Sequence, residues 1–325
     1  MATAQTTFRD LIAENKRNSV LLVAIFALFV AIVATVLSLV LVELFAPRGG
    51  ALDLREAAVV GIVAAAISLG LSLIGYYAGD GMILAVSKAR PVAHDVDPEL
   101  FNVVEEMSIA AGLPMPKIYV IEDSAPNAFA TGRDPAHASL AITSGLRAKL
   151  TRDELQGVVA HEMSHIRNFD TRLMLLMAVL VGTIAILADL VWQTLRFSRL
   201  PGGRSRDRES GNGAGPVVML ILLAIGVVLA IVAPILAQII QLAVSRQREY
   251  LADASGVELT RYPEGLANAL RKIDADPDVL EVANRGTAHL YIANPIKKFE
   301  ERSGSIFASH PPIKERIQRL EALTV

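Results

Sequence analysis

Four long apolar runs dominate the hydrophobic pattern of the chain. The first extends from Ser19 to Val42 and the second from Ala57 to Gly79, and neither contains a charged residue. At about 1.5 Å per residue, each run is long enough to cross a hydrocarbon core of about 30 Å. We therefore predict a transmembrane hairpin over residues 19–79, preceded by a polar cytoplasmic tail over residues 1–18.

The third and fourth apolar runs are less regular than the first two. Residues 173–195 are interrupted by Asp189, and residues 217–244 contain two glutamines. The linking residues 196–215 are rich in Gly, Ser and Arg, which predicts a mobile loop. We predict that residues 173–244 form a second transmembrane or membrane-associated helix pair. Two buried helices of a large soluble core are the alternative.

The remaining segments, residues 80–172 and 245–325, have the mixed polarity of a folded domain. The first segment predicts a helix, three short strands and a second helix that opens on a capping box at Thr151 to Glu154. The second segment predicts mostly helices. The predicted helix spans Asp97 to Ala111, and the strands span Lys117–Glu122, Asn127–Thr131 and Ser139–Thr143. The fold class is therefore a mostly α membrane protein with an α+β domain split between these two segments.

The second helix of the first segment carries the sequence His161-Glu162-Met163-Ser164-His165. Residues four apart lie on one helical face, so both imidazoles can reach one zinc ion while Glu162 lies beside it. This H-E-x-x-H pattern is typical of metalloproteases. The alternative is a pair of solvated helix histidines.

Composition narrows the chemistry further. Hydrophobic residues make up 53% of the 325 residues and charged residues only 20%, which indicates that part of the chain lies in lipid. The formal net charge of −2 gives no indication of a nucleic-acid partner. Because cysteine is absent, a zinc ion must be held by histidine and carboxylate.

Two histidines alone leave a zinc ion short of protein ligands. Glu249 follows the fourth apolar run closely, and Asp253 lies one helical turn later on the same face. Glu249 would be the third ligand, and Asp253 would accept a hydrogen bond from the far nitrogen of a ligating histidine. On spacing alone, an exposed acidic pair beside the neighbouring arginines is the better explanation.

The motif and its surroundings resemble the HtpX-type membrane metallopeptidases, which are glutamate-zincins. The order of two apolar runs, a catalytic segment, two further runs and a tail also matches, so the resemblance covers nearly the whole chain. It implies a zincin-like metallopeptidase domain in a multi-pass protein of the cell (inner or plasma) membrane. The matching pieces are Asn127–Gly132, His161–Asp170, Arg248–Tyr250 with Ala252–Asp253, and Ser309–Pro312.

The resemblance also implies the roles of individual residues. It makes His161, His165 and Glu249 the ligands of one Zn²⁺ per chain, and it makes Glu162 the catalytic base that activates water. His310 matches a histidine that stabilises the oxyanion, although a histidine at a helix start before two prolines explains it equally well.

A substrate-binding strand is a further implication of the resemblance. Asn127, Ala128, Phe129 and Ala130 match an edge strand that binds the substrate backbone by strand addition. An ordinary core strand is the alternative. The other histidines, His94, His137 and His289, lack ligand spacing and are interpreted as surface or structural residues.

Membership implies an endopeptidase that degrades misfolded or damaged membrane proteins in membrane quality control and the stress response. Its partners would be unfolded membrane proteins and the lipid bilayer. The prenyl-protein (CAAX) endopeptidases have a similar motif but carry more spans, so they rank second. A non-catalytic metal-binding scaffold or chaperone is a third hypothesis, against which the intact Glu162 argues.

The distribution of Lys and Arg favours a catalytic domain that faces the cytoplasm, because more of them flank the runs on that side. The arginines between the third and fourth runs argue the other way, or indicate that this pair of runs does not fully cross. If the helices that carry His165 and Glu249 continue into the third and fourth runs, the zinc ion would lie within about 10 Å of the membrane surface.

Overall fold

The computed structural model describes residues 17–21, 23–25, 28, 54–178, 246–281, 287–293 and 311–323. The chain divides into two compact units by its internal contacts. One unit comprises residues 1–20, 74–178 and 240–325, and the other comprises residues 21–73 and 179–239. The segments 80–172 and 245–325, which we assigned to one domain, both fall in the first unit.

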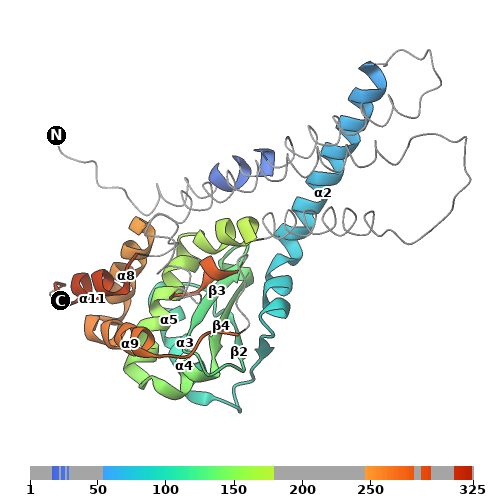
Figure 1. The fold of residues 1–325 in the computed structure, drawn as a ribbon. Helices are drawn as coiled ribbons and strands as arrows, with labels where there is room; N and C mark the ends of the chain where they lie inside the picture. The colour runs from blue at the N-terminus through green and yellow to red at the C-terminus, as the bar shows by residue number, and fades with distance from the viewer. Residues whose placement is uncertain are drawn as a thin grey trace, which may run out of the picture. The chain divides into compact units, whose positions relative to one another are not determined.

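Helix α2 (Leu54–Val86) is continuous over 33 residues and includes the second apolar run. Figure 1 shows it as a long blue helix. Within the described parts of the chain, no helix is long and apolar enough to cross a membrane. The other three apolar runs and the loop 196–215 lie largely or wholly outside the described residues.

A four-stranded mixed sheet forms the centre of the first unit (Figure 1). Its strand order is β1-β2-β4-β3, in which β2 and β4 are parallel and the other two pairs are antiparallel. The three strands expected from the sequence are confirmed to within one or two residues at each end. The strands are β1 (Arg90–Pro91), β2 (Lys117–Ile121), β3 (Ala128–Gly132) and β4 (Ala138–Thr143).

Helix α3 (Pro98–Ala111) has the ends that its sequence predicts. The Asp97 side chain accepts a hydrogen bond from the Leu100 N–H at 3.1 Å, and Pro98 occupies the first turn. Gly112 ends the helix in the left-handed region at φ 65°, which costs a glycine little. The short elements η1 (Pro135–His137) and α4 (Ser144–Lys149) flank β4.

Helix α5 (Arg152–Arg167) begins at the predicted capping box. The Glu154 N–H donates to Thr151 Oγ1 at 3.4 Å, and the Thr151 N–H donates to Glu154 Oε2 at 2.7 Å. The apolar stripe of this helix is buried, as expected from its spacing. Its members are Leu155, Val158, Val159, Met163 and Ile166.

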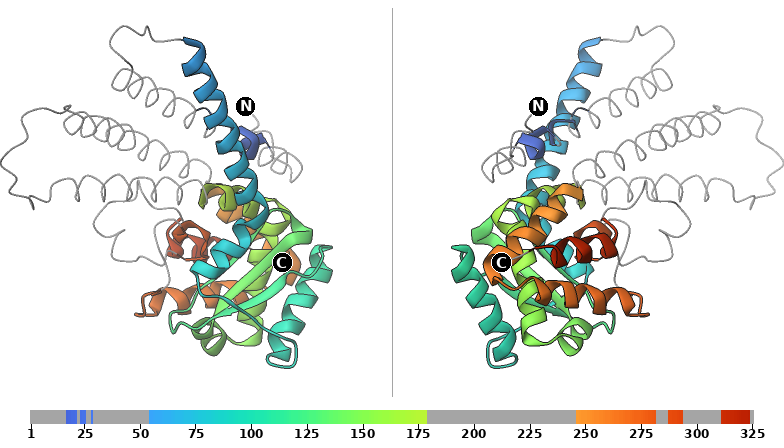
Figure 2. Two further views of the ribbon diagram at one scale, coloured as in Figure 1. Left: turned by 90° about the vertical axis from the view of Figure 1, so that its right-hand side faces the viewer. Right: turned by 90° about the vertical axis from the view of Figure 1, so that its left-hand side faces the viewer.

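The C-terminal segment supplies α8 (Arg246–Thr260), α9 (Pro263–Ala275), η2 (Ala288–Leu290) and α11 (Ile313–Glu321). Helix α5 packs against α3, α8, α9 and β3, so it lies at the centre of the unit. Figure 2 shows the orange and red C-terminal helices beside the green part of the unit. Small residues permit this packing, because a Cβ on Gly157 would lie 2.6 Å from the backbone nitrogen of Leu266.

Candidate metal centre

His161 and His165 project from one face of α5 and meet at their outer nitrogens. The two Nε2 atoms lie 3.2 Å apart, and the ring centroids lie 4.8 Å apart in an edge-to-face arrangement. Both residues are nearly fully buried. The four-residue spacing has therefore placed two imidazoles at one buried point, and the alternative of two solvated histidines is wrong.

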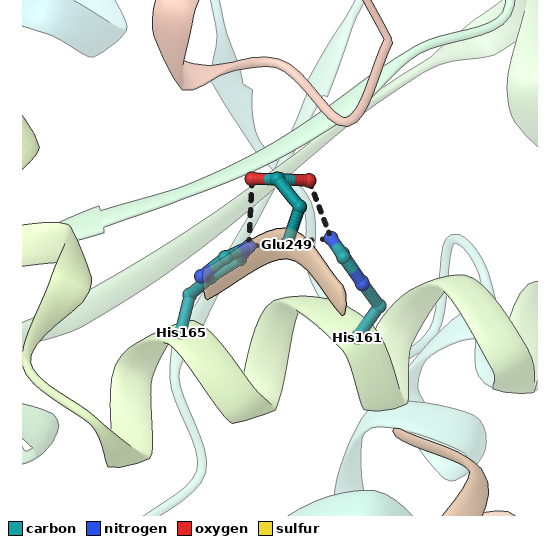
Figure 3. Close-up of side chains that lie close together, drawn as sticks. All are labelled: His161, His165 and Glu249. Atoms are coloured by element: carbon teal, nitrogen blue, oxygen red, sulfur yellow. Dashed lines mark hydrogen bonds and ion pairs between the residues drawn. The ribbon is translucent and has the colours of Figure 1, made fainter. Parts of the chain in front are cut away.

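Glu249 on α8 completes the cluster (Figure 3). Its Oε2 atom lies 3.7 Å from His161 Nε2, and its Oε1 atom lies 3.6 Å from His165 Nε2. One ligand atom from each of these three buried residues lies within 4.8 Å of the others. Helix α8 comes this close because Gly256 faces α5. A Cβ at Gly256 would lie 3.2 Å from the backbone nitrogen of His161.

Each histidine also contacts a carboxylate through its other nitrogen. His161 Nδ1 lies 3.0 Å from Asp253 Oδ1, and His165 Nδ1 lies 3.0 Å from Asp170 Oδ2. In the neutral imidazole, the form that binds a metal, we assign the proton of each ring to Nδ1, because a carboxylate accepts a hydrogen bond there. Both Nε2 atoms then present their lone pairs to the same point.

The structure places Asp253 where the sequence analysis expected a hydrogen-bond acceptor. Asp170 was missed in that role, although it lies five residues after His165 in the matched stretch. The reason is a turn that helical spacing does not predict. Helix α5 ends at Arg167, Phe169 has φ 60°, and residues 170–178 are again helical. Helix α5 therefore does not continue unbroken into the third apolar run, and the condition on which the distance to the membrane was predicted is not met there.

Different neighbours set different pKa values for the two histidines. Burial lowers the pKa of His161, and the charge of Arg316 acts in the same direction, against the hydrogen bond to Asp253. Burial also lowers the pKa of His165, but the hydrogen bond to Asp170 and nearby carboxylates outweigh it and raise the pKa to about 9. A metal ion therefore has to displace a proton from His165, because metals bind the neutral imidazole.

Glu162 lies next to His161 and is 2% exposed. The backbone N–H of Ala130 on β3 donates a hydrogen bond to its carboxylate. Burial, together with the charge of Glu249, raises the pKa of Glu162 to about 7 against the opposing charge of His165. A carboxylate with this pKa can accept and release a proton near neutral pH.

Arg316 on α11 is a further member of the centre that the sequence analysis did not identify. Its side chain is fully buried, and its guanidinium contacts Asp253, Glu249 and the ring of His161. Nothing in the charged sequence of α11 distinguishes Arg316 from the other cations of that helix. Burial against a distant carboxylate is a tertiary property, and only the fold reveals it.

Another segment of the chain contacts part of the predicted substrate strand. Ala128 O accepts a hydrogen bond from the Ile292 N–H at 2.9 Å, and the Asn127 side chain donates to Ala293 O at 3.0 Å. Phe129 is fully buried and packs edge-to-face on Tyr291 at 5.1 Å. Residues 287–293 of the chain itself thus contact β3 at Asn127, Ala128 and Phe129. The role of Asn127, Ala128, Phe129 and Ala130 in binding substrate stays a prediction, and a core strand stays its alternative.

The remaining histidines fit the interpretation as surface or structural residues. His94 and His137 are exposed, and His137 Nδ1 lies 2.7 Å from Asp134. His289 is buried, and its Nε2 lies 3.2 Å from Met174 O. His310 lies outside the described residues, so its predicted role at the oxyanion stays a prediction.

The donor set fits zinc. Two imidazole nitrogens and a carboxylate oxygen are its usual protein ligands in catalytic centres, where water or substrate occupies the remaining position. The hydrogen bonds from both Nδ1 atoms to carboxylates match the support that zinc-binding histidines receive elsewhere. His161, His165 and Glu249 could hold the ion, and Glu162 lies beside them without belonging to the cluster.

Comparison with known proteins gives a consistent result. The model of Peptidase family M48 matches residues 95–324. A Protease HtpX homolog of Caldanaerobacter subterraneus subsp. tengcongensis is 42% identical over 98% of this chain and 99% of its own. A homolog of the same name from Thermoanaerobacter pseudethanolicus is 46% identical over 82% of this chain and 85% of its own.

A solved structure is also similar to the chain. The crystal structure of S. mikatae Ste24p matches with a TM-score of 0.43 and 22% identity, and the match covers 77% of this chain and 58% of that one.

Proposed function

Because the chain belongs to peptidase family M48 and is a membrane zinc metallopeptidase, we propose that His161, His165 and Glu249 hold its zinc ion and that Glu162 is its catalytic base. The observation that carries this assignment is the convergence of both His Nε2 atoms and the Glu249 carboxylate at one buried point. Each Nδ1 atom faces a carboxylate, which favours the tautomer that binds a metal.

Peptide hydrolysis needs an activated water and a protonated leaving group. When bound, zinc supplies a Lewis acid that lowers the pKa of water towards about 7 and polarises the scissile carbonyl. The Glu162 carboxylate accepts the proton of the attacking water and then donates it to the nitrogen of the leaving amine. The N–H of Ala130 orients this carboxylate.

We infer that the substrates are misfolded or damaged membrane proteins and that the catalytic segments face the cytoplasm. The long apolar runs support a substrate encountered at the membrane, and the Lys and Arg distribution supports this orientation. Orientation can be tested directly because the chain has no cysteine. A single cysteine in place of exposed Glu258 should react with a membrane-impermeant maleimide only after cells are lysed. Labelling in intact spheroplasts would show that the catalytic segments face the opposite side of the membrane.

Proteolysis of casein by the purified full-length protein in detergent tests the catalytic assignment. We expect Glu162→Gln to lower the cleavage rate by at least about 10²- to 10⁴-fold, because it removes the general base. A zinc chelator should have a similar effect, reversed by added Zn²⁺. The matched control is Glu258→Gln on the exposed face of α8, which should cleave like the wild type.

Two outcomes would contradict this proposal. Cleavage that is insensitive to both the chelator and Glu162→Gln would remove the peptidase assignment and favour a metal-binding scaffold. Cleavage confined to prenylated C-terminal peptides, with casein and unfolded membrane proteins intact, would favour a prenyl-protein endopeptidase.

A further inference from the structure

Arg316 makes a two-pronged interaction with Asp253 inside the protein. Its Nη2 lies 2.7 Å from Asp253 Oδ1, and its Nε lies 2.9 Å from Asp253 Oδ2. Both partners are buried, since Arg316 is 0% and Asp253 is 4% exposed. Paired hydrogen bonds between guanidinium and carboxylate fix the orientation of both groups. The carboxylate that contacts His161 Nδ1 therefore cannot rotate freely.

The same guanidinium reaches three other residues around the centre. Arg316 Nη1 donates to Ile292 O at 2.8 Å and lies 3.4 Å from Glu249 Oε2. Its Nη2 lies 3.4 Å from both ring nitrogens of His161. The Arg316 side chain thus connects Asp253, the candidate ligand Glu249 and the backbone of Ile292.

We propose that Arg316 is a positioning residue of the metal centre, which holds Asp253 and Glu249 in the geometry that zinc binding requires. This inference rests on the proposed function of His161 and Glu249 as ligands. Arg316 acts through those residues and is not itself a catalytic group. Its Nε, Nη1 and Nη2 atoms all donate to acceptors within the chain.

The chemistry of arginine explains why this position requires it. A lysine ammonium is a compact charge that cannot bind both oxygens of Asp253 in one plane while also reaching Ile292 O. Removing the guanidinium would also leave the Asp253 carboxylate buried without its charge partner. Arg319, one turn later on α11, makes a useful contrast. It lies over the Tyr250 ring at 3.6 Å and contacts Glu315, and its side chain is 57% exposed.

The test measures zinc affinity of the full-length protein in detergent by competition with a chelator, alongside kcat and KM for casein. We expect Arg316→Lys to raise the zinc dissociation constant about 10- to 100-fold, the usual effect of losing support for a ligand. At saturating zinc, kcat should fall while KM stays within about twofold, because Arg316 is fully buried and acts through Asp253 and Glu249. Arg319→Lys is the matched control and should leave zinc affinity and kcat unchanged.

A double-mutant cycle separates positioning from a general loss of stability. If Arg316 acts through Asp253, then Arg316→Lys combined with Asp253→Asn should weaken zinc binding little more than either change alone. Fully additive losses, or an Arg316→Lys variant whose zinc affinity stays within twofold of the wild type, would overturn the proposal.

Two further points keep the test decisive. If Arg316→Lys does not fold, Asp253→Asn alone carries the test, and unchanged zinc affinity in that variant would reject the proposal. The outcome is also distinct from that of the catalytic assignment. Full activity of Glu162→Gln would reject Glu162 as the base and leave the effect of Arg316 on zinc binding intact. Unaltered zinc binding by the Arg316 variant would reject the positioning role and leave Glu162 as the base.

Discussion

His165 Nδ1 lies 3.0 Å from Asp170 Oδ2 across the turn at which α5 ends. Asp170 in turn lies 3.5 Å from the guanidinium of Arg248. The same order of groups occurs at the other histidine, where Asp253 lies between His161 and Arg316. Each imidazole is oriented by a buried carboxylate that an arginine accompanies.

Asp170→Asn should weaken zinc binding about 10- to 100-fold, because the amide no longer reliably accepts the Nδ1 proton of His165. Chelator competition on the purified protein measures this change. Asp153→Asn, at an exposed position in the first turn of α5, is the control and should bind zinc like the wild type. Equal zinc affinity of the Asp170 and Asp153 variants would show that His165 does not need its carboxylate.

The contact between α5 and α9 depends on the absence of a side chain at Gly157. A Cβ there would lie 2.6 Å from Leu266 N and 2.9 Å from Leu266 Cα. These are backbone atoms, which cannot move away by a side-chain rotation. Gly157→Ala should therefore reduce the free energy of unfolding by about 1–3 kcal/mol, seen as a lower thermal midpoint. Gly81→Ala on α2, with nothing within 4 Å, should cause no loss. An unchanged midpoint for Gly157→Ala would contradict this packing.

A substitution at Asn127 tests whether this residue stabilises the fold or binds substrate. Its side chain donates to Ala293 O at 3.0 Å and accepts from the Ala128 N–H at 3.1 Å. Asn127→Ala should destabilise the protein by about 1–3 kcal/mol, because buried backbone groups lose partners. Asn102→Ala, at an exposed position on α3, is the control and should not lower the stability. A raised KM with full thermal stability would mean that Asn127 binds substrate instead.

The capping box of α5 makes part of the stability depend on pH. Burial opposes ionisation of Glu154, but hydrogen bonds from Lys272 and the Thr151 backbone outweigh it and lower the pKa of Glu154 below 4.5. The folded state then holds the proton less tightly than the unfolded state. This contribution is complete above about pH 4.5 and is lost as pH falls through the lower folded pKa.

Glu154→Gln should accordingly destabilise the protein by about 0.5–2 kcal/mol at pH 6.5, and this difference should shrink as pH falls below about 4.5. Thermal unfolding of both proteins across this range measures it. Glu264→Gln, at an exposed position in the first turn of α9, should shift the midpoint little at any pH. A Glu154→Gln penalty that is constant with pH would contradict the linkage.

Local signals in the sequence account for the parts of the fold that were predicted. The capping box at Thr151 and Glu154, the N-cap at Asp97 and the stripe from Leu155 to Ile166 each depend on residues within a few positions of one another. The helical spacing of His161 and His165 is local in the same way. Such features are set by local backbone geometry and do not depend on contacts between distant segments.

The features that were missed depend on contacts between distant segments. Arg316 meets Asp253 only after α11 packs near α8, and no spacing rule relates their positions. Asp170 required the turn at Phe169, whose positive φ is uncommon for a residue with a side chain. The contact of residues 287–293 with β3 also joins distant segments, and the sequence gives no sign of it. Glu249 was placed by family resemblance, since its spacing alone favoured an exposed residue.

The central claim is that one zinc ion is held jointly by α5 and α8. Elemental analysis of the purified full-length protein, with Glu249→Ala compared against exposed Glu258→Ala on the same helix, tests it most directly. We predict about one zinc per chain for the wild type and the Glu258 variant, and a large loss of zinc from the Glu249 variant after mild dialysis. Full zinc retention by the Glu249 variant, or a wild-type protein without zinc, would contradict the account.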